Sequence, residues 1–342
     1  MARRFSICFG VVSFGNALSL DNLSKNMTAL RPNRPNRPNR SLRVVANDLE
    51  HHVLEWEPDL SASQPAAGDR VVRTVVLVHG FMDAAGTWDL VAPALAAQGL
   101  RVLAPDMRGF GEGARAGRGG HYHFVDYVFD LADLVEVLAP GDPIAVVGHS
   151  MGGTIATLFS GTFPERVARL AIIEGVGPPD NPWEMGPTRM RGWIEQVRAS
   201  RSRGKDGAPP TFSREEALRR MGANHPAVPP EVLEHRLPHL ASDAGEGRLT
   251  WQFDPLHRTT SPMPFFAKLF VEFAKKVTCP VLFVSGGPSG YHPPDEEERL
   301  GAFASCRRAE LPDAGHMVHW TRPEELTPLL LDHLRRKDHR ED

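Results

Sequence analysis

The stretch PIAVVGHSMGG, residues 143 to 153, decides the fold. A short apolar run leads into the pattern G-x-S-x-G, in which Ser150 lies between Gly148 and Gly152, and a helical pattern follows over about 151 to 163. A serine between a buried strand and a helix is typical of a sharp, strained turn, and the flanking glycines let neighbouring backbone pass without Cβ clashes. Such a turn projects the hydroxyl at the carboxyl edge of a parallel sheet, so we predict that Ser150 is a nucleophile.

Strands and helices alternate on both sides of this stretch. Each predicted strand is a short apolar run closed by glycine or a polar residue, as is typical of buried parallel strands. The runs are TVVLVHG at 74 to 80, LRVLAPD at 100 to 106, PIAVVGHS at 143 to 150, RVARLAIIE at 166 to 174 and CPVLFVSGG at 279 to 287. Apolar residues at spacings of three and four predict a helix over 124 to 138 that packs on the sheet. The sequence therefore predicts an α/β fold with a doubly wound, mostly parallel sheet.

The alternation stops at Gly175 and resumes only near 279, which indicates an insertion. Residues 178 to 275 are richer in Pro, Arg and helix formers than in β-branched residues, so we predict a mainly helical lid there. A lid supplies an apolar wall and excludes water from a site beneath it. The core is then expected over 42 to 177 and 276 to 338. Its last part should hold a helix near 294 to 304, a strand near 307 to 311 and a helix over about 323 to 336.

The first 41 residues differ from the rest. An apolar stretch, FSICFGVVSFG at 5 to 15, follows two arginines, and the triplet repeat RPNRPNRPNR occupies 31 to 40. Prolines at that density exclude a helix, so we predict a disordered, solvated leader over 1 to 41. The alternative is a weak signal-like segment, since arginines before an apolar run resemble the start of a signal peptide. The first interpretation implies a cytoplasmic protein and the second a secreted one.

Composition and charge exclude several classes of protein. The 342 residues include 39 Lys and Arg against 42 Asp and Glu, and the net charge of -3 offers no general attraction to nucleic acid or anionic lipid. The chain contains no run of about 18 apolar residues, so we predict no transmembrane helix. Three scattered cysteines, Cys8, Cys279 and Cys306, match neither a disulfide framework nor a zinc site, which favours a reducing compartment. We therefore predict no cofactor, no metal and a small-molecule substrate as partner, with the oligomeric state left open.

A serine hydroxyl needs a base, and the best candidate follows the last predicted strand, in LPDAGHMVHW at 311 to 320. His316 comes after an Ala-Gly pair in a loop that leads to the final helix, so we predict that it is the base. His319 is the nearest competitor, but it lies closer to the helix start and lacks that hinge.

Two backbone amides are expected to stabilise an oxyanion. One donor comes from the residue after the nucleophile, here Met151, and the other from the loop after an earlier strand. In VHGFMD at 78 to 83 the amide of Phe81 is in the right place. His79, at the end of the same strand, is expected to form a structural hydrogen bond to the loop.

Together these motifs resemble the α/β-hydrolase superfamily, and specifically its lidded branch. That branch holds haloalkane dehalogenases, epoxide hydrolases, C-C bond hydrolases, perhydrolases and serine hydrolase-like proteins. The likeness covers about 43 to 336, where HGF, D-x-R-G-x-G, GHSMGG, FPERV and AGH come in the family's order. The resemblance implies an α/β-hydrolase fold with a lid and a catalytic triad in the chain order nucleophile, acid, histidine.

The acid of the triad is not where the family most often has it. That position, after the strand CPVLFVSGG, is filled by Ser289 or Gly290. Some members of the lidded branch carry the acid after the preceding strand, which here implies Glu174 in AIIEGVG. A carboxylate at that strand end can accept the Nδ1-H of His316 and stabilise the imidazolium. Asp295, in PPDEEER, is the alternative, although a helix start capped by acidic residues is the plainer interpretation of that stretch.

The nucleophile separates the activities of the branch. Its dehalogenases and epoxide hydrolases form an ester on an aspartate, whereas this chain has a serine, which disfavours both activities. We therefore predict a cofactor-independent serine hydrolase with the triad Ser150, His316 and Glu174, acting through an acyl-enzyme on small to medium apolar carboxylic esters. C-C bond hydrolysis and perhydrolysis use the same triad and stay open. A ligand-binding or receptor module with vestigial turnover is the alternative from another class.

Overall fold

The computed structural model describes residues 38–61, 72–117, 119–203 and 210–336. The leader predicted over 1 to 41 therefore lies outside the described residues up to residue 37. Arg40 and Ser41 already belong to the first strand, so the regular structure begins two residues before the predicted start of the core.

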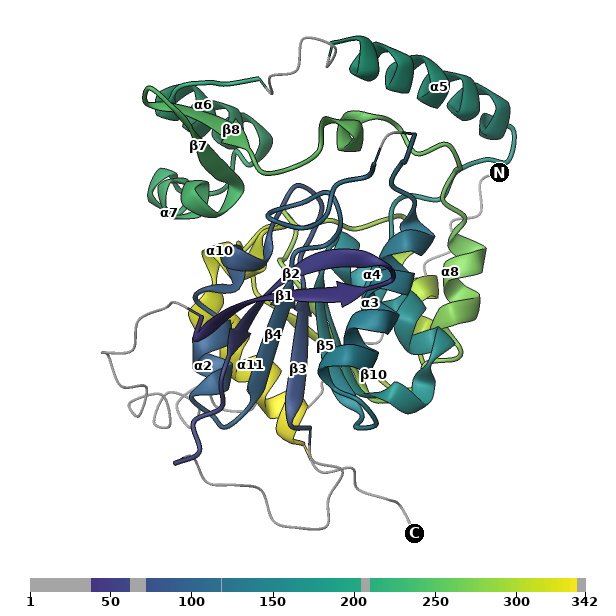
Figure 1. Ribbon diagram of the computed structural model, residues 1–342. Helices are drawn as coiled ribbons and strands as arrows, with labels where there is room; N and C mark the ends of the chain where they lie inside the picture. The colour runs from purple at the N-terminus through teal and green to yellow at the C-terminus, as the bar shows by residue number, and fades with distance from the viewer. Residues whose placement is uncertain (1–37, 62–71, 118, 204–209, 337–342) are drawn as a thin grey trace, which may run out of the picture. The chain divides into compact units, whose positions relative to one another are not determined.

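Within the described residues, eight strands form one sheet, in the order β1-β2-β4-β3-β5-β6-β9-β10 (Figure 1). The strands are β1 (Arg40–Ala46), β2 (Leu49–Trp56), β3 (Thr74–Val78), β4 (Arg101–Pro105), β5 (Ile144–His149), β6 (Val167–Ile173), β9 (Val281–Ser285) and β10 (Cys306–Glu310). β2 pairs antiparallel with β1 and with β4, and the pairings from β4 through β10 are parallel. The predicted α/β fold with a mostly parallel sheet is confirmed.

The β1–β2 hairpin lies outside the strands predicted from the sequence. Its two-residue turn uses Asn47 and Asp48, both with positive φ (49° and 54°), which are residue types that tolerate this conformation in a tight hairpin. β2 buries the polar side chains of His51, His52 and Glu55, so its sequence lacks the apolar run by which the other strands are recognised. The hairpin extends the sheet beyond β4.

Helices cover both faces of the sheet. On one face lie α3 (Phe124–Leu138), α4 (Met151–Thr162) and α8 (Ala267–Ala274), and on the other α2 (Ala92–Ala96) and α11 (Pro323–Arg335) (Figure 1). Short helices complete the core: η1 (Ala85–Trp88), η2 (Pro164–Arg166), α9 (Glu296–Gly301) and α10 (Val318–Thr321). None of the helices in the described part of the chain has the length and hydropathy needed to cross a lipid bilayer.

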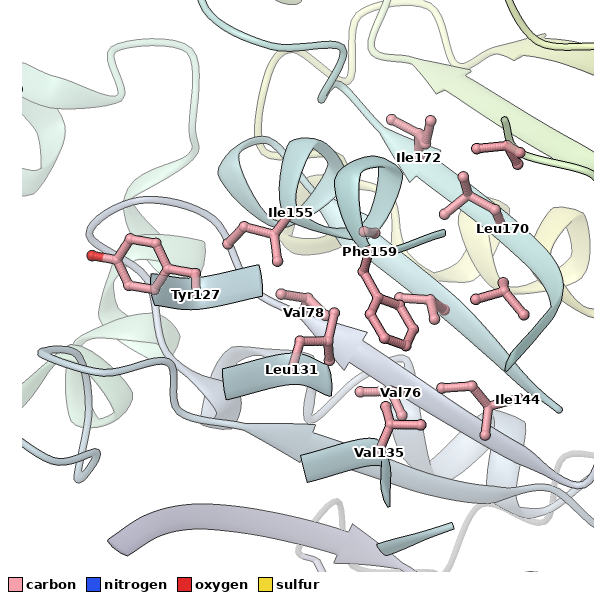
Figure 2. Close-up of a cluster of buried hydrophobic side chains, with 14 of the residues drawn as sticks. Val76, Val78, Tyr127, Leu131, Val135, Ile144, Ile155, Phe159, Leu170 and Ile172 are labelled. Carbon is pink, nitrogen blue, oxygen red and sulfur yellow. The ribbon is translucent and has the colours of Figure 1, made fainter. Parts of the chain in front are cut away.

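Each face of the sheet has its own hydrophobic cluster. Val76 and Val78 of β3 point into the cluster under α3 and α4, while Val75 and Leu77 point into the one under α2 and α11. Successive side chains of a strand face opposite sides, so an apolar strand serves both clusters. Figure 2 shows the first cluster, in which Phe159 of α4 lies among side chains from β3, β5, β6 and α3.

The inserted segment between β6 and β9 is mostly helical but also contains a hairpin. Its elements are α5 (Met185–Arg203), α6 (Arg214–Asn224), α7 (Pro230–Leu240), β7 (Ala241–Gly245), β8 (Arg248–Trp251), η4 (Pro255–Arg258) and α8. The β7–β8 hairpin was not expected from the sequence. Its turn, Gly245-Glu246-Gly247, has positive φ at all three residues, which two glycines make possible.

Apolar contacts attach this segment to the core at two of its helical parts. Side chains of α6 and α7 form a third hydrophobic cluster with Ala84, Met317 and Trp320 of the core. α8 contributes Phe270 and Ala274 to the cluster under α4, although the predicted boundary at 275 assigns it to the lid. That boundary stays a prediction.

Truncation of a core side chain should reveal how much the first cluster contributes to stability. Phe159 is 1% exposed, so Phe159→Ala removes a buried ring and leaves a cavity. We expect the free energy of unfolding to fall by about 3–5 kcal/mol, measured by urea denaturation. The matched control is Phe129→Ala on α3, where the ring is 55% exposed and the expected change is within about 0.5 kcal/mol. Equal losses in the two variants would contradict the assignment of Phe159 to the core.

Candidate active site

Ser150 occupies a strained turn between β5 and α4. Its backbone has φ 52° and ψ -116°, a conformation that a non-glycine residue rarely adopts. The turn also requires glycine on both sides. A Cβ on Gly148 would lie 2.3 Å from the carbonyl oxygen of Gly152, and a Cβ on Gly152 would lie 2.2 Å from that of Val78. The G-x-S-x-G spacing therefore follows from close packing of backbone.

The structure brings together the three residues predicted as a triad, Ser150, His316 and Glu174. His316, in the loop between β10 and α10, has its Nε2 2.9 Å from Ser150 Oγ. Its Nδ1 lies 3.2 Å from Glu174 Oε2. If Nδ1-H donates to the carboxylate, Nε2 is left as the acceptor for the serine hydroxyl. This is the geometry in which an imidazole can remove the proton from serine.

Glu174 follows β6 and is 1% exposed. The amide of Gly286 donates to its Oε1 at 2.5 Å, and the amide of Tyr291 donates to its Oε2. Both donors come from the loop after β9, in which residues 286 to 294 include no acid. A Cβ on Gly290 would lie 2.4 Å from Oε1, so glycine at this position leaves space for the carboxylate.

Asp295, the alternative acid, makes a different contact. It lies at the start of α9 and pairs with Arg299 at 2.8 Å. The Arg299 guanidinium is buried and donates to the carbonyl oxygens of Val176, Gly177 and Pro178. Arg299 therefore holds the backbone that follows Glu174. This role was not predicted from the sequence, although the Asp295-Arg299 spacing of four in an acidic helix start could have suggested the pair.

His149, between Gly148 and Ser150, was also missed. Its Nε2 donates to the carbonyl oxygen of His316 at 2.8 Å, which fixes the loop that carries His316. His319, the competitor for the base, lies 3.0 Å from Asp83 Oδ2 and is fully buried. Burial lowers the pKa of both His149 and His319, so both rings are neutral near pH 7.

The two predicted amide donors belong to the loop after β3 and the start of α4. Among the described residues, neither Phe81 N-H nor Met151 N-H has a backbone acceptor. His79 stabilises the first loop, because its Nδ1 bonds the Gly80 carbonyl at 2.7 Å and its Nε2 accepts from Met107 N-H at 3.0 Å. This is the structural role that the sequence predicted for His79. Free amides beside a nucleophile can bind an oxyanion.

A cavity of about 440 Å³ opens above Ser150 and His316. Most of its wall is apolar or aromatic, and the inserted segment contributes Trp193, Leu256 and Pro262. Within the described residues, the wall contains no Lys or Arg. The cavity therefore suits an uncharged ligand of small to medium size.

His257 is part of this wall and belongs to an aromatic stack. Its ring lies between Phe110 (3.9 Å between centroids) and Tyr122 (4.0 Å). A Cβ on Gly109 would lie 2.2 Å from its Nε2, so the ring is packed closely against the backbone of that loop. Burial lowers the pKa of His257 to about 4. The ring is therefore neutral near pH 7 and adds no charge to the cavity.

The chain is similar to known proteins both in sequence and in fold. Residues 73–323, more than half of the chain, match the family described as alpha/beta hydrolase fold. A serine hydrolase-like protein of Dictyostelium discoideum is 25% identical over 225 residues, which cover 64% of this chain and 60% of that protein. A 2-hydroxy-6-oxo-2,4-heptadienoate hydrolase of Pseudomonas putida is 41% identical over 106 residues, which cover 30% of this chain and 37% of that protein.

In both relatives the matched part is less than two thirds of the protein. Among solved structures, the crystal structure of a hypothetical protein of Pseudomonas aeruginosa has a TM-score of 0.71 at 24% identity. The match covers 86% of this chain and 97% of that one, so the two proteins share the fold.

The buried neutral His257 should make stability depend on pH. In the unfolded chain the pKa of His257 returns to 6.5. As the pH falls below 6.5, the imidazole is therefore protonated in the unfolded state while it stays neutral in the folded state. The contribution of His257 to the free energy of unfolding is therefore fully present above pH 6.5 and is lost as the pH falls toward 4. We expect wild type to lose about 2 kcal/mol more than His257→Phe between pH 7 and 5, measured by urea denaturation at each pH.

Phenylalanine keeps a ring in the stack and does not titrate, so the other buried histidines contribute equally to both proteins. Parallel stability profiles for wild type and His257→Phe would show that His257 is not held neutral by burial.

Proposed function

Because the chain belongs to the alpha/beta-hydrolase-fold family, we propose that it is a serine hydrolase that cleaves small to medium apolar carboxylic esters through an acyl-enzyme. The observation that carries the proposal is the hydrogen-bonded series from Ser150 Oγ through His316 to Glu174, with distances of 2.9 and 3.2 Å. A base within reach of a hydroxyl, itself oriented by a buried carboxylate, is the arrangement that activates serine.

The reaction proceeds in two halves. Ser150 Oγ attacks the ester carbonyl while its proton passes to His316 Nε2, and the amides of Phe81 and Met151 donate to the oxyanion that forms. The tetrahedral intermediate collapses, the C-O bond to the alcohol breaks, and His316 returns the proton to the leaving oxygen. Water then attacks the acyl group with His316 as base, which releases the acid and restores Ser150.

Glu174 is assigned the role of orienting and stabilising His316. Its carboxylate accepts Nδ1-H, which leaves Nε2 free to act on the serine, and its negative charge stabilises the imidazolium. The backbone amides of Gly286 and Tyr291 hold the carboxylate in position. Asp295 is the less suitable acid because it is paired with Arg299.

The cavity supports an uncharged acyl group. Without Lys or Arg among the described wall residues, a substrate carboxylate would lose its hydration and gain no cationic partner. This weighs against C-C bond hydrolysis of an anionic substrate such as the one that the Pseudomonas putida relative is named for, although that reaction and perhydrolysis use the same three residues. A binding module with vestigial turnover has no need of the aligned Ser150, His316 and Glu174.

The proposal is tested with p-nitrophenyl esters of increasing acyl length. Because each methylene buried in an apolar cavity contributes about 0.8 kcal/mol, kcat/KM should rise up to about fourfold per methylene until the cavity is full. Mono-p-nitrophenyl succinate, which ends in a carboxylate, should be at least about tenfold poorer than the butyrate ester, since burying an unpaired charge is costly. Ser150→Ala should lower kcat/KM at least about 10⁴-fold.

A fluorophosphonate probe provides the control that does not depend on substrate choice. It should label wild type and leave Ser150→Ala unlabelled. Equal labelling of the two proteins would reject Ser150 as nucleophile. Labelling of wild type without turnover of any ester would reject the ester substrate and direct attention to C-C bonds or to ligand binding.

The choice of acid is tested by a pair of isosteric changes. Glu174→Gln keeps the shape but removes the charge and the proper tautomer of His316, so kcat should fall by about 10³- to 10⁴-fold. Asp295→Asn should change kcat by less than about tenfold, because Asp295 contacts Arg299 rather than His316. Both are measured on the best ester of the series, after thermal unfolding has shown that each variant is folded. A large loss confined to Asp295→Asn would show that Glu174 is not the acid.

A further inference from the structure

Three side chains of types that bind metal ions lie close together outside the cavity wall, where α7 meets η1. They are Asp89, which follows η1, and His235 and His239 on α7, and we call them the Asp89 cluster. None of the three lines the cavity above Ser150. The proposed hydrolysis gives them no role.

The three side chains converge on one point. His235 Nε2 lies 2.7 Å from Asp89 Oδ2, and His239 Nε2 lies 3.3 Å from the same oxygen. The ligand atoms of all three residues lie within 4.8 Å of one another. Residues four apart on a helix share a face, so α7 presents both imidazoles to the carboxylate. Three ligand atoms at these separations can surround one ion with bonds near 2 Å after small side-chain movements.

Neighbouring groups orient the cluster. Arg236 Nη1 donates to the Thr87 carbonyl at 3.0 Å and also bonds Asp89 Oδ1, which leaves Oδ2 directed at the histidines. A Cβ on Gly86 would lie 2.5 Å from His239 Nδ1, so this glycine leaves room for the ring. His235 is nearly half exposed, which gives an ion access from solvent. Fixed orientation of ligands by a surrounding shell is typical of metal centres.

We propose that the Asp89 cluster binds one divalent transition-metal ion, with Zn²⁺ the best match, through His235 Nε2, His239 Nε2 and Asp89 Oδ2. Two imidazoles and one carboxylate are a donor set that suits Zn²⁺, and water from the exposed side completes four-coordination. The alkaline-earth ions Mg²⁺ and Ca²⁺ prefer oxygen ligands and do not suit this set. The absence of a metal was predicted from the cysteines, whereas this donor set contains no cysteine.

Arg236 sets the strength of the site. Its charge repels a cation and neutralises part of the Asp89 carboxylate, so the affinity should be lower than that of an otherwise equal site without the arginine. Binding nevertheless joins α7 to η1 and thereby attaches the inserted segment to the part of the core that follows the Phe81 loop. An ion that binds only the folded arrangement also raises the melting temperature.

The experiment uses metal-free protein without a histidine tag. Co²⁺ is added while visible absorption is recorded, and Zn²⁺ binding is measured by calorimetry. We expect one ion per chain, the absorption of a four-coordinate Co²⁺ site, and a Zn²⁺-dependent rise in melting temperature. His235→Gln and His239→Gln should each weaken binding at least about tenfold and reduce the rise in melting temperature at a given Zn²⁺ concentration.

Two control variants separate this site from other histidines. His292→Gln removes a histidine that also pairs with an acid four residues away, Glu296. Among the residues that the structure describes, His292 belongs to no group of three ligands, so this variant should bind like wild type. His316→Ala should also keep the ion. Loss of binding in His316→Ala with retention in His235→Gln would place the ion at Ser150 and reject the proposal.

Absence of stoichiometric Co²⁺ or Zn²⁺ binding to wild type would likewise reject it. The cluster would then be a set of polar contacts among Asp89, Arg236 and the two histidines, and His239→Gln would behave like wild type in the presence of metal. Because binding is measured directly, a failure here leaves the proposed ester hydrolysis unaffected.

Discussion

The buried carboxylate of Glu174 is the constraint on which the rest of the site depends. A charged group with 1% exposure is costly unless hydrogen bonds replace its water. Gly286, Tyr291 and His316 supply those bonds, so the loop after β9 must wrap around a side chain that comes from β6. The glycine at 290 and the absence of an acid beside it are two consequences of the same arrangement, since the carboxylate already fills the space.

The turns that carry Ser150 and Glu174 also support each other. Both residues have positive φ, and each such strained residue costs about 1–3 kcal/mol, which the surrounding packing must offset. The amide of Ser150 donates to the carbonyl of Ile173, directly before Glu174. A Cβ on Gly175 would lie 2.4 Å from the carbonyl oxygen of Ser150. The two turns are thus packed backbone to backbone, which keeps the hydroxyl and the carboxylate on opposite sides of His316.

The parts of the fold that can be predicted from the sequence are those whose buried side chains form a regular apolar pattern. The helix at 124 to 138 and the parallel strands are recognisable for this reason, and the serine turn has its own glycine spacing. β2 was missed because its buried side chains include His51, His52 and Glu55, whose partners lie on other elements. Arg299 and His149 were missed for a related reason, since each acts through backbone carbonyls that are distant in sequence. Hydrogen bonds between residues that are far apart in the chain produce no repeating pattern in the sequence from which they could be predicted.

The inserted segment is connected to the core at several places. Arg299 binds its first residues, at Val176 to Pro178, and His257 near its end stacks on Phe110 of the core. Between these, Arg236 of α7 bonds Thr87 and Asp89. Because these contacts lie on different elements, the volume and the neutrality of the cavity follow from where the segment is held and not from the catalytic residues themselves. Selectivity for substrate can therefore change through the inserted segment while Ser150, His316 and Glu174 keep the same geometry.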